Sequence, residues 1–279
     1  MTTAATPVIF IHGLWVHGSA WADWMARFEV AGYLPVAPGW PGDAETVGAT
    51  RAHPEAVANV SVQQATDHFA RIAREFSVPP IVVGHSFGGL IAQKLLEAGV
   101  VSAAVAIDPS GIKGVKALPI AQIRAVFPII SKKSNRTKGI ALTRRQFRFA
   151  FGNKIARQEA DSLFDKWSVP STALPVFETA SQKKDANSGT KINTAKQDRG
   201  PLLITGGQFD HTVPEVVTRQ SYELYTGSAK TDYHRFDNRG HSLTMDHGWT
   251  EVADYVLGWL GRQSLGTVTG GATTRAEKI

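Results

Sequence analysis

Short apolar segments rich in β-branched residues recur along the chain, and most of them are followed by a segment with helical periodicity. The apolar segments are expected to be buried strands, and they span residues 7–11, 33–37, 81–84, 103–107, 201–205 and 231–236. Helical patterns span residues 19–31, 62–76, 88–98, 215–225 and 249–260. This alternation predicts an α/β fold, in which a mostly parallel sheet of about six strands is flanked by helices.

The alternation is interrupted between residues 112 and 199. The interruption is too long for a simple crossover between parallel strands. It contains helical patterns at residues 143–151 and 156–167, whereas residues 43–59, earlier in the chain, are loop-like. We therefore expect a helical cap, inserted after the strand that ends near Asp108.

The domain boundaries follow from this interruption. A length of 279 residues suits one core with an inserted subdomain. The tail that follows the last helical pattern is rich in Gly and Thr, which is typical of disordered segments. The expected parts are a core (7–111 and 199–262), a cap insertion (112–198) and a disordered tail (263–279).

Positive charge is concentrated in the first half of the expected cap. Residues 113–157 contain twelve Lys and Arg residues and no Asp or Glu, although the net charge of the whole chain is only +6. Two interpretations are open: a solvated outer face, or a surface that attracts an anionic substrate or an acidic partner. No recognition motif for nucleic acid accompanies the charge, so nucleic acid is not an expected partner.

The composition excludes several kinds of chemistry. There is no cysteine, and therefore no disulfide, no thiolate metal site and no cysteine nucleophile. The first residues lack the basic start and the long apolar run of a secretory signal. No stretch approaches the roughly 18 to 20 apolar residues that a membrane span requires. We expect a cytoplasmic protein without a membrane span.

The motif with the clearest chemical meaning is Gly84-His85-Ser86-Phe87-Gly88, which fits the pattern G-x-S-x-G. A strand pattern precedes it and a helix pattern follows. On such a turn the serine hydroxyl projects above the edge of the sheet, and side chains two residues away would collide. Ser86 is therefore the expected nucleophile, and the N–H of Phe87 is an expected oxyanion donor. The alternative is a serine that merely caps a helix.

A second oxyanion donor is expected in the loop after the first strand. This loop reads His12-Gly13-Leu14-Trp15, and the N–H of Leu14 is the expected donor. His12 is expected to shape the loop through hydrogen bonds. Trp15 and Trp40 lie on loops at the same edge of the sheet, and we expect them to line the substrate pocket.

Together these motifs resemble the α/β-hydrolase superfamily, in particular its small capped bacterial-type serine esterases. The similar segments are residues 12–15, 84–89, 207–210 and 240–241, so the resemblance spans nearly the whole chain. Few residues precede the first strand, so the two antiparallel strands that usually begin this fold are expected to be missing. The resemblance implies that the catalytic residues follow the order nucleophile, acid, histidine.

Among nine histidines, His241 is the expected general base. It lies in the loop between the last strand and the last helix, which returns to the edge of the sheet where ligands gather. His211 and His247 are alternatives. The expected acid is Asp210, directly after a strand, and Asp108, at the end of the preceding strand, is its competitor.

The expected function is hydrolysis of a carboxylic ester or lactone through an acyl-enzyme on Ser86. The substrate would be a small molecule, and the reaction needs neither a metal nor an organic cofactor. A serine at position 86 disfavours haloalkane dehalogenase and epoxide hydrolase chemistry, since relatives with those activities use aspartate there. Alternatives are hydroxynitrile lyase, perhydrolase or cofactor-free oxygenase chemistry on the same triad, or a non-catalytic ligand-binding protein of this fold.

Overall fold

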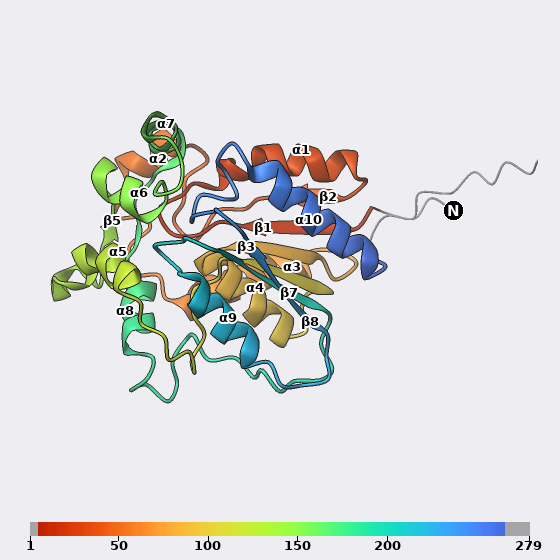
Figure 1. The fold of residues 1–279 in the computed structure, drawn as a ribbon. Helices are drawn as coiled ribbons and strands as arrows, with labels where there is room; N and C mark the ends of the chain where they lie inside the picture. The colour runs from red at the N-terminus through yellow and green to blue at the C-terminus, as the bar shows by residue number, and fades with distance from the viewer. Residues whose placement is uncertain (1–4, 266–279) are drawn as a thin grey trace, which may run out of the picture.

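The computed structural model describes residues 5–265, and its centre is a single parallel sheet (Figure 1). Six strands lie in the order β2-β1-β3-β4-β7-β8, and every neighbouring pair is parallel. The strands are β1 (Pro7–Ile11), β2 (Leu34–Val36), β3 (Ile81–His85), β4 (Ala103–Ile107), β7 (Leu202–Gly207) and β8 (Thr231–Phe236). The predicted fold class is confirmed.

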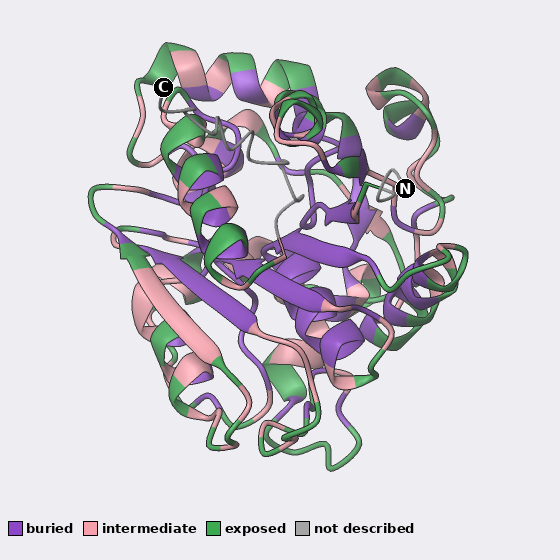
Figure 2. Cartoon of the chain, turned by 90° about the vertical axis from the view of Figure 1, so that its right-hand side faces the viewer, coloured by how far each residue is buried: buried purple, intermediate pink, exposed green. Residues whose placement is uncertain are grey.

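Helices cover both faces of the sheet because successive side chains of its strands point to opposite faces. Val8 and Phe10 of β1 pack against one group of helices, and Ile9 and Ile11 pack against the other. The first group is α1 (Ala22–Val30), preceded by the short helix η1 (Gly18–Trp21), and α10 (Trp249–Arg262). The second group is α3 (Val62–Arg74), α4 (Phe87–Glu97) and α9 (Glu215–Glu223). Figure 2 shows the resulting burial: the central strands are buried, and the edge strand β8 is mostly half-buried.

Seven short elements form the insertion between β4 and β7, beyond the carboxyl ends of the strands (Figure 1). They are α5 (Ile120–Ile130), η2 (Lys133–Asn135), β5 (Gly139–Ile140), α6 (Arg144–Ala150), α7 (Arg157–Trp167), β6 (Ser171–Thr172) and α8 (Leu174–Ser181). The two short strands pair antiparallel with each other. Helices therefore occupy the insertion expected after Asp108, and α6 and α7 fall on the two helical patterns found there.

Three helices had no clear signal in the sequence. The residues expected to be loop-like include α2 (Val47–Ala52), which begins where the Thr46 hydroxyl accepts a hydrogen bond from the N–H of Ala49. α5 and α8 are apolar on most sides, so no polar stripe reveals their period. α5 also contains Pro128, which ordinarily argues against a helix interior.

The end of the described chain is packed against the core. After α10, the Tyr33 hydroxyl donates a hydrogen bond of 3.0 Å to the carbonyl of Leu265. Residues 266–279, most of the tail expected to be disordered, lie outside the described residues. Between residues 5 and 265, no helix combines the length and the apolar character needed to cross a membrane.

Candidate active site

Ser86 occupies the turn between β3 and α4 in a backbone conformation that non-glycine residues rarely adopt. Its φ is +57° and its ψ is −121°. Two backbone hydrogen bonds hold this conformation: the N–H of Ser86 donates to Ile107 (2.9 Å), and its carbonyl accepts from Ser110 (3.0 Å). The serine is therefore fixed in a strained turn, as the motif predicts.

The two glycines of the motif are required by close backbone contacts. A Cβ atom on Gly84 would lie 2.1 Å from the carbonyl oxygen of Gly88, and one on Gly88 would lie 2.1 Å from that of Ile11. Any side chain at either position would have to displace backbone. The pattern G-x-S-x-G thus reflects the packing of α4 against β1 and β3.

Asp210 and His241 come together above the carboxyl ends of β7 and β8. The Nδ1 atom of His241 lies 2.5 Å from Oδ2 of Asp210. The other oxygen of Asp210 accepts hydrogen bonds from the N–H groups of Thr212 (2.6 Å) and Val213 (2.8 Å). The carboxylate is therefore oriented by its own loop and in turn orients the imidazole.

The second imidazole nitrogen of His241, Nε2, is not used in a hydrogen bond. It has no hydrogen-bond partner among residues 5–265, Ser86 included. Catalytic hydrogen bonds are often formed only when substrate binds. Burial lowers the pKa of His241 to about 4, so the ring is uncharged at neutral pH and can accept a proton.

Asp108 lies behind this pair rather than in it. Its Oδ2 is 3.9 Å from Nδ1 of His241, and its Oδ1 accepts a 2.8 Å hydrogen bond from the N–H of Gly207. Burial and the neighbouring Asp210 raise the pKa of Asp108 well above its usual range, and its Oδ2 has no hydrogen-bond partner among the described residues. Burial also raises the pKa of Asp210, to about 7, but its N–H donors oppose that shift. Of the two carboxyl groups, Asp108 is therefore the one that we expect to hold a proton.

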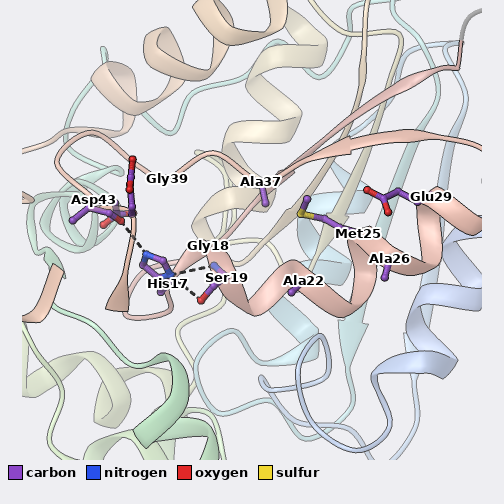
Figure 3. Close-up of a pocket in the computed structure, with 12 residues that line it drawn as sticks. His17, Gly18, Ser19, Ala22, Met25, Ala26, Glu29, Ala37, Gly39 and Asp43 are labelled. Carbon is purple, nitrogen blue, oxygen red and sulfur yellow. Dashed lines mark hydrogen bonds between the residues drawn. The ribbon is translucent and has the colours of Figure 1, made fainter. Parts of the chain in front are cut away.

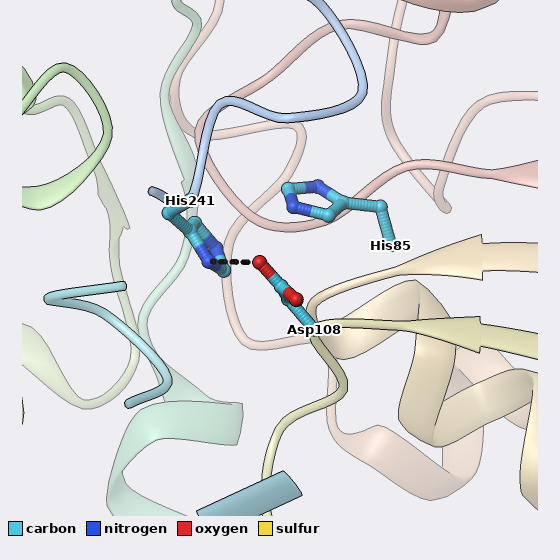
Figure 4. A group of neighbouring side chains, drawn as sticks. All are labelled: His85, Asp108 and His241. Carbon is cyan, nitrogen blue, oxygen red and sulfur yellow. Dashed lines mark ion pairs between the residues drawn. The ribbon is translucent and has the colours of Figure 1, made fainter. Parts of the chain in front are cut away.

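His85, Asp108 and His241 form a buried cluster of groups that metals can use as ligands (Figure 4). Their nitrogen and oxygen atoms lie within 4.8 Å of one another. Nδ1 of His241 is already bonded to Asp210, and Oδ1 of Asp108 accepts a hydrogen bond from the N–H of Gly207. Because two of the three groups are already hydrogen-bonded within the protein, the cluster fits a buried polar network better than a metal site.

The loop after β1 lies against Ser86, the expected nucleophile. A Cβ atom on Gly13 would lie 2.6 Å from Cβ of Ser86 and 3.3 Å from its Oγ. Within residues 5–265, no hydrogen bond uses the N–H of Leu14 or Phe87, whereas the N–H of Trp15 donates to Oγ of Ser171 (2.7 Å). The two expected oxyanion donors are thus free to bind substrate.

His12 and Trp40 support this loop from behind. Nδ1 of His12 lies 2.9 Å from the carbonyl of Gly13, and its Nε2 lies 3.0 Å from Oδ2 of Asp43. The indole N–H of Trp40 donates to the carbonyl of His12 (2.9 Å). Trp40 was expected to line the substrate pocket, but the structure places it beside the loop and not among the residues of the cavity at Ser86.

The cavity at Ser86 has a volume of about 350 Å³ and lies between the sheet edge and the insertion. Trp15, Ser86 and Phe87 line its inner end. Most of the remaining wall is apolar and comes from α5, α8, α9 and the adjoining loops (among others Val115, Val126, Ile130, Val176, Val213 and Val217). Its polar exceptions are Ser110, Gln122, Thr179, Gln182, Lys183 and Thr212. Apolar pockets with a few polar groups are typical of small-molecule sites.

Sequence reasoning missed the side chain that covers the candidate base. The ring of Phe151 meets the ring of His241 edge-on, with 4.9 Å between their centroids, and His241 has no exposed surface. Phe151 is one of several Phe residues in the insertion, so only the contact itself distinguishes it. The alternative bases are elsewhere: Nδ1 of His211 contacts the carbonyl of Phe149, and exposed His247 pairs with Glu159.

A second hollow, of about 540 Å³, lies between η1, α1 and the loop after β2 (Figure 3). His17, Met25, Glu29 and Asp43 are among its lining residues. Neither Ser86, Asp210 nor His241 reaches it. The chemistry implied by the serine is therefore confined to the smaller cavity.

The sequence of the chain also matches the model of a known protein family. The model of the alpha/beta hydrolase family matches residues 8–255. The chain belongs to the alpha/beta hydrolase family. No curated protein is significantly similar to the chain.

Solved structures of other alpha/beta hydrolases share the fold at low identity. A monoacylglycerol lipase of Paleococcus ferrophilus is 20% identical, over 94% of this chain and 96% of the lipase, with a TM-score of 0.62. A thermophilic esterase of Thermogutta terrifontis is 14% identical, over 94% and 92%, with a TM-score of 0.65. A methylesterase of Arabidopsis is 14% identical, over 92% and 100%, with a TM-score of 0.64. Such identities establish the fold, and the reaction has to be argued from the site.

Replacing Gly13 with alanine is expected to damage the site of this alpha/beta hydrolase. The new Cβ would overlap Ser86, so the loop must move away and carry the N–H of Leu14 with it. Loss of one oxyanion donor typically lowers kcat by about 10²- to 10³-fold. The measurement is kcat for a p-nitrophenyl ester. Gly48→Ala is the control because its Cβ would meet nothing within 4 Å, and equal kcat values for the two variants would contradict the assignment.

Proposed function

We propose that this alpha/beta hydrolase is a serine hydrolase that cleaves a carboxylic ester or lactone. The observation that carries the proposal is the strained Ser86 beside two unused N–H groups, at the inner end of an apolar cavity. A free nucleophile next to free oxyanion donors is the arrangement that acyl transfer needs. The apolar wall suits the acyl part of an uncharged ester.

In the proposed reaction, His241 takes the proton of Ser86 as the hydroxyl oxygen attacks the carbonyl carbon. The N–H groups of Leu14 and Phe87 stabilise the oxyanion, and Asp210 stabilises the protonated imidazole. His241 then gives the proton to the leaving alkoxide, which leaves an acyl-enzyme on Ser86. Water deprotonated by His241 releases the acid and restores the serine.

The buried setting of the base supports this assignment. His241 is uncharged at neutral pH because burial lowers its pKa, so a proton acceptor is present before substrate binds. Its bond to Asp210 holds the Nδ1–H tautomer and leaves Nε2, which has no hydrogen-bond partner within residues 5–265, as the proton acceptor. Phe151 packs on the ring, and His241 has no exposed surface.

The test is a fluorophosphonate probe combined with a panel of p-nitrophenyl esters and lactones. We expect one probe molecule per chain, mapped by peptide mass spectrometry to the peptide with Ser86, and turnover of at least one ester or lactone. Labelling without turnover of any ester or lactone would favour another reaction on the same triad, such as hydroxynitrile lyase chemistry. Absence of both would favour a ligand-binding protein.

A further inference from the structure

Large apolar side chains are exposed on α5 and at Leu118, which lies two residues before the helix begins. Leu118 is 67% exposed, Ile120 84%, Ile123 37% and Phe127 58%. Ile120, Ile123 and Phe127 are spaced so that they share one side of the helix. We call these four residues the α5 patch, and α5 lies at the outer edge of the molecule (Figure 1). Elsewhere in residues 5–265, exposed large apolar side chains are scattered over separate elements (Val30, Leu34, Val78 and Phe209).

The α5 patch adjoins the mouth of the cavity at Ser86. Leu118 and Ile123 are exposed and also line that cavity. The opposite side of α5 contributes Val126 and Ile130 to the cavity wall. One helix therefore presents apolar side chains to the outside and to the substrate cavity.

Exposed positive charges flank the α5 patch along the chain. Lys116, Arg124, Lys132, Lys133 and Arg136 are exposed, and none of them forms an ion pair with a described residue. By contrast, two other cations of the insertion are neutralised by acids of α7: Arg144 by Asp165, and Arg148 by Asp161. Glu178 of α8 is near enough for the charge of Arg136 to act on its pKa, but its carboxylate accepts a hydrogen bond from the N–H of Val62 and forms no ion pair with a described residue.

We propose that the α5 patch docks on an anionic lipid surface. Apolar side chains on an exposed helix can enter the boundary between headgroups and acyl chains, while flanking Lys and Arg bind anionic headgroups. A second copy of this chain fits less well, because a two-fold interface would bring the same cations face to face. If the proposed esterase function holds, the docked enzyme draws a lipid-like ester from the surface into the cavity. Docking itself does not depend on the reaction.

The docking test uses the full chain with Ser86→Ala, so that no ester is consumed. Binding is measured by flotation with vesicles of phosphatidylcholine alone and of phosphatidylcholine mixed equally with phosphatidylglycerol. We expect binding to the mixed vesicles only. Adding Ile120→Ser and Phe127→Ser should weaken it at least about tenfold, whereas Val30→Ser and Leu34→Ser, on α1 and β2, should leave it within about twofold.

The charge contribution is tested in the same assay. Each surface cation is worth about fivefold in binding to such vesicles, so Lys132→Glu with Lys133→Glu should weaken binding by at least about tenfold. The matched control is Arg71→Glu with Arg74→Glu, two exposed cations of α3, which should have little effect.

Several results would overturn docking. They are no binding to the mixed vesicles, equal losses in the variants and their controls, or a dimer in sedimentation equilibrium that Ile120→Ser and Phe127→Ser dissociate. Neither Ile120 nor Phe127 lines the cavity, so turnover of a short soluble ester by the Ser86 form should be unchanged by these substitutions. Vesicle binding without any ester turnover would instead refute the proposed function and leave docking standing.

Discussion

Replacing Ser86 with alanine is expected to abolish ester turnover and leave the fold intact. The substitution removes the atom that forms the acyl-enzyme, and where a nucleophile works as one unit with its base, its loss costs about 10⁴- to 10⁶-fold in kcat. The backbone at position 86 has φ = +57°, which alanine must adopt just as serine does, so little change in stability is expected. The measurements are kcat for the best ester substrate and the thermal unfolding midpoint.

The control for Ser86→Ala is Ser221→Ala. Ser221 is also buried, but it lies on α9, where its hydroxyl bonds to the carbonyl of Val217 within the helix. This control should keep its turnover. If Ser86→Ala retained more than about a tenth of the activity with an unchanged unfolding midpoint, Ser86 would not be the nucleophile.

The second large effect is a contrast between the two buried aspartates. Asp210→Asn should lower kcat by about 10⁴-fold, because an amide cannot stabilise the protonated His241 and can favour the wrong tautomer of its ring. Asp108→Asn should change kcat by less than about tenfold. If Asp108 carries a proton, asparagine reproduces it: the amide oxygen accepts from the N–H of Gly207, and the amide group donates to Asp210.

Comparing kcat of Asp210→Asn with kcat of Asp108→Asn shows which of the two aspartates is the acid that partners His241. Both variants are assayed on the same ester, and thermal unfolding shows whether each remains folded. Asp108→Leu extends the series, since it leaves the N–H of Gly207 and the carboxylate of Asp210 without their buried partner and should lower the unfolding midpoint. Equal losses for Asp108→Asn and Asp210→Asn would mean that the pair acts as one unit.

The basic segment shows why charge counted along the sequence can mislead. Residues 113–157 contain no acid, but α7 begins at the end of this window, and its Asp161 and Asp165 neutralise Arg144 and Arg148. The remaining exposed cations near α5 form no ion pair with any residue between 5 and 265. The region with excess positive charge is therefore smaller than the sequence suggests, and it includes the surroundings of the α5 patch.

Local sequence determined the strand positions, the strand-to-helix turn at Ser86 and the parallel fold, because each depends on residues close together in the chain. Apolar strands such as β3 and β4 are recognisable wherever they lie, and Gly84 and Gly88 mark a turn that tolerates no side chain. The order of β7, Asp210, β8 and His241 also placed the acid and the base at the same end of the sheet.

Tertiary structure alone decided which aspartate meets His241, where Trp40 lies and what forms the cavity. Asp108 and Asp210 both follow strands that end beside His241, and only the orientation of their loops separates 3.9 Å from 2.5 Å. Helix α5 has apolar side chains both on the side that faces the cavity and on an exposed side. Like α8, it therefore has no polar stripe, and its helical period could not be recognised from the sequence. Contacts of this kind join residues far apart in the chain, and neither spacing nor periodicity records them.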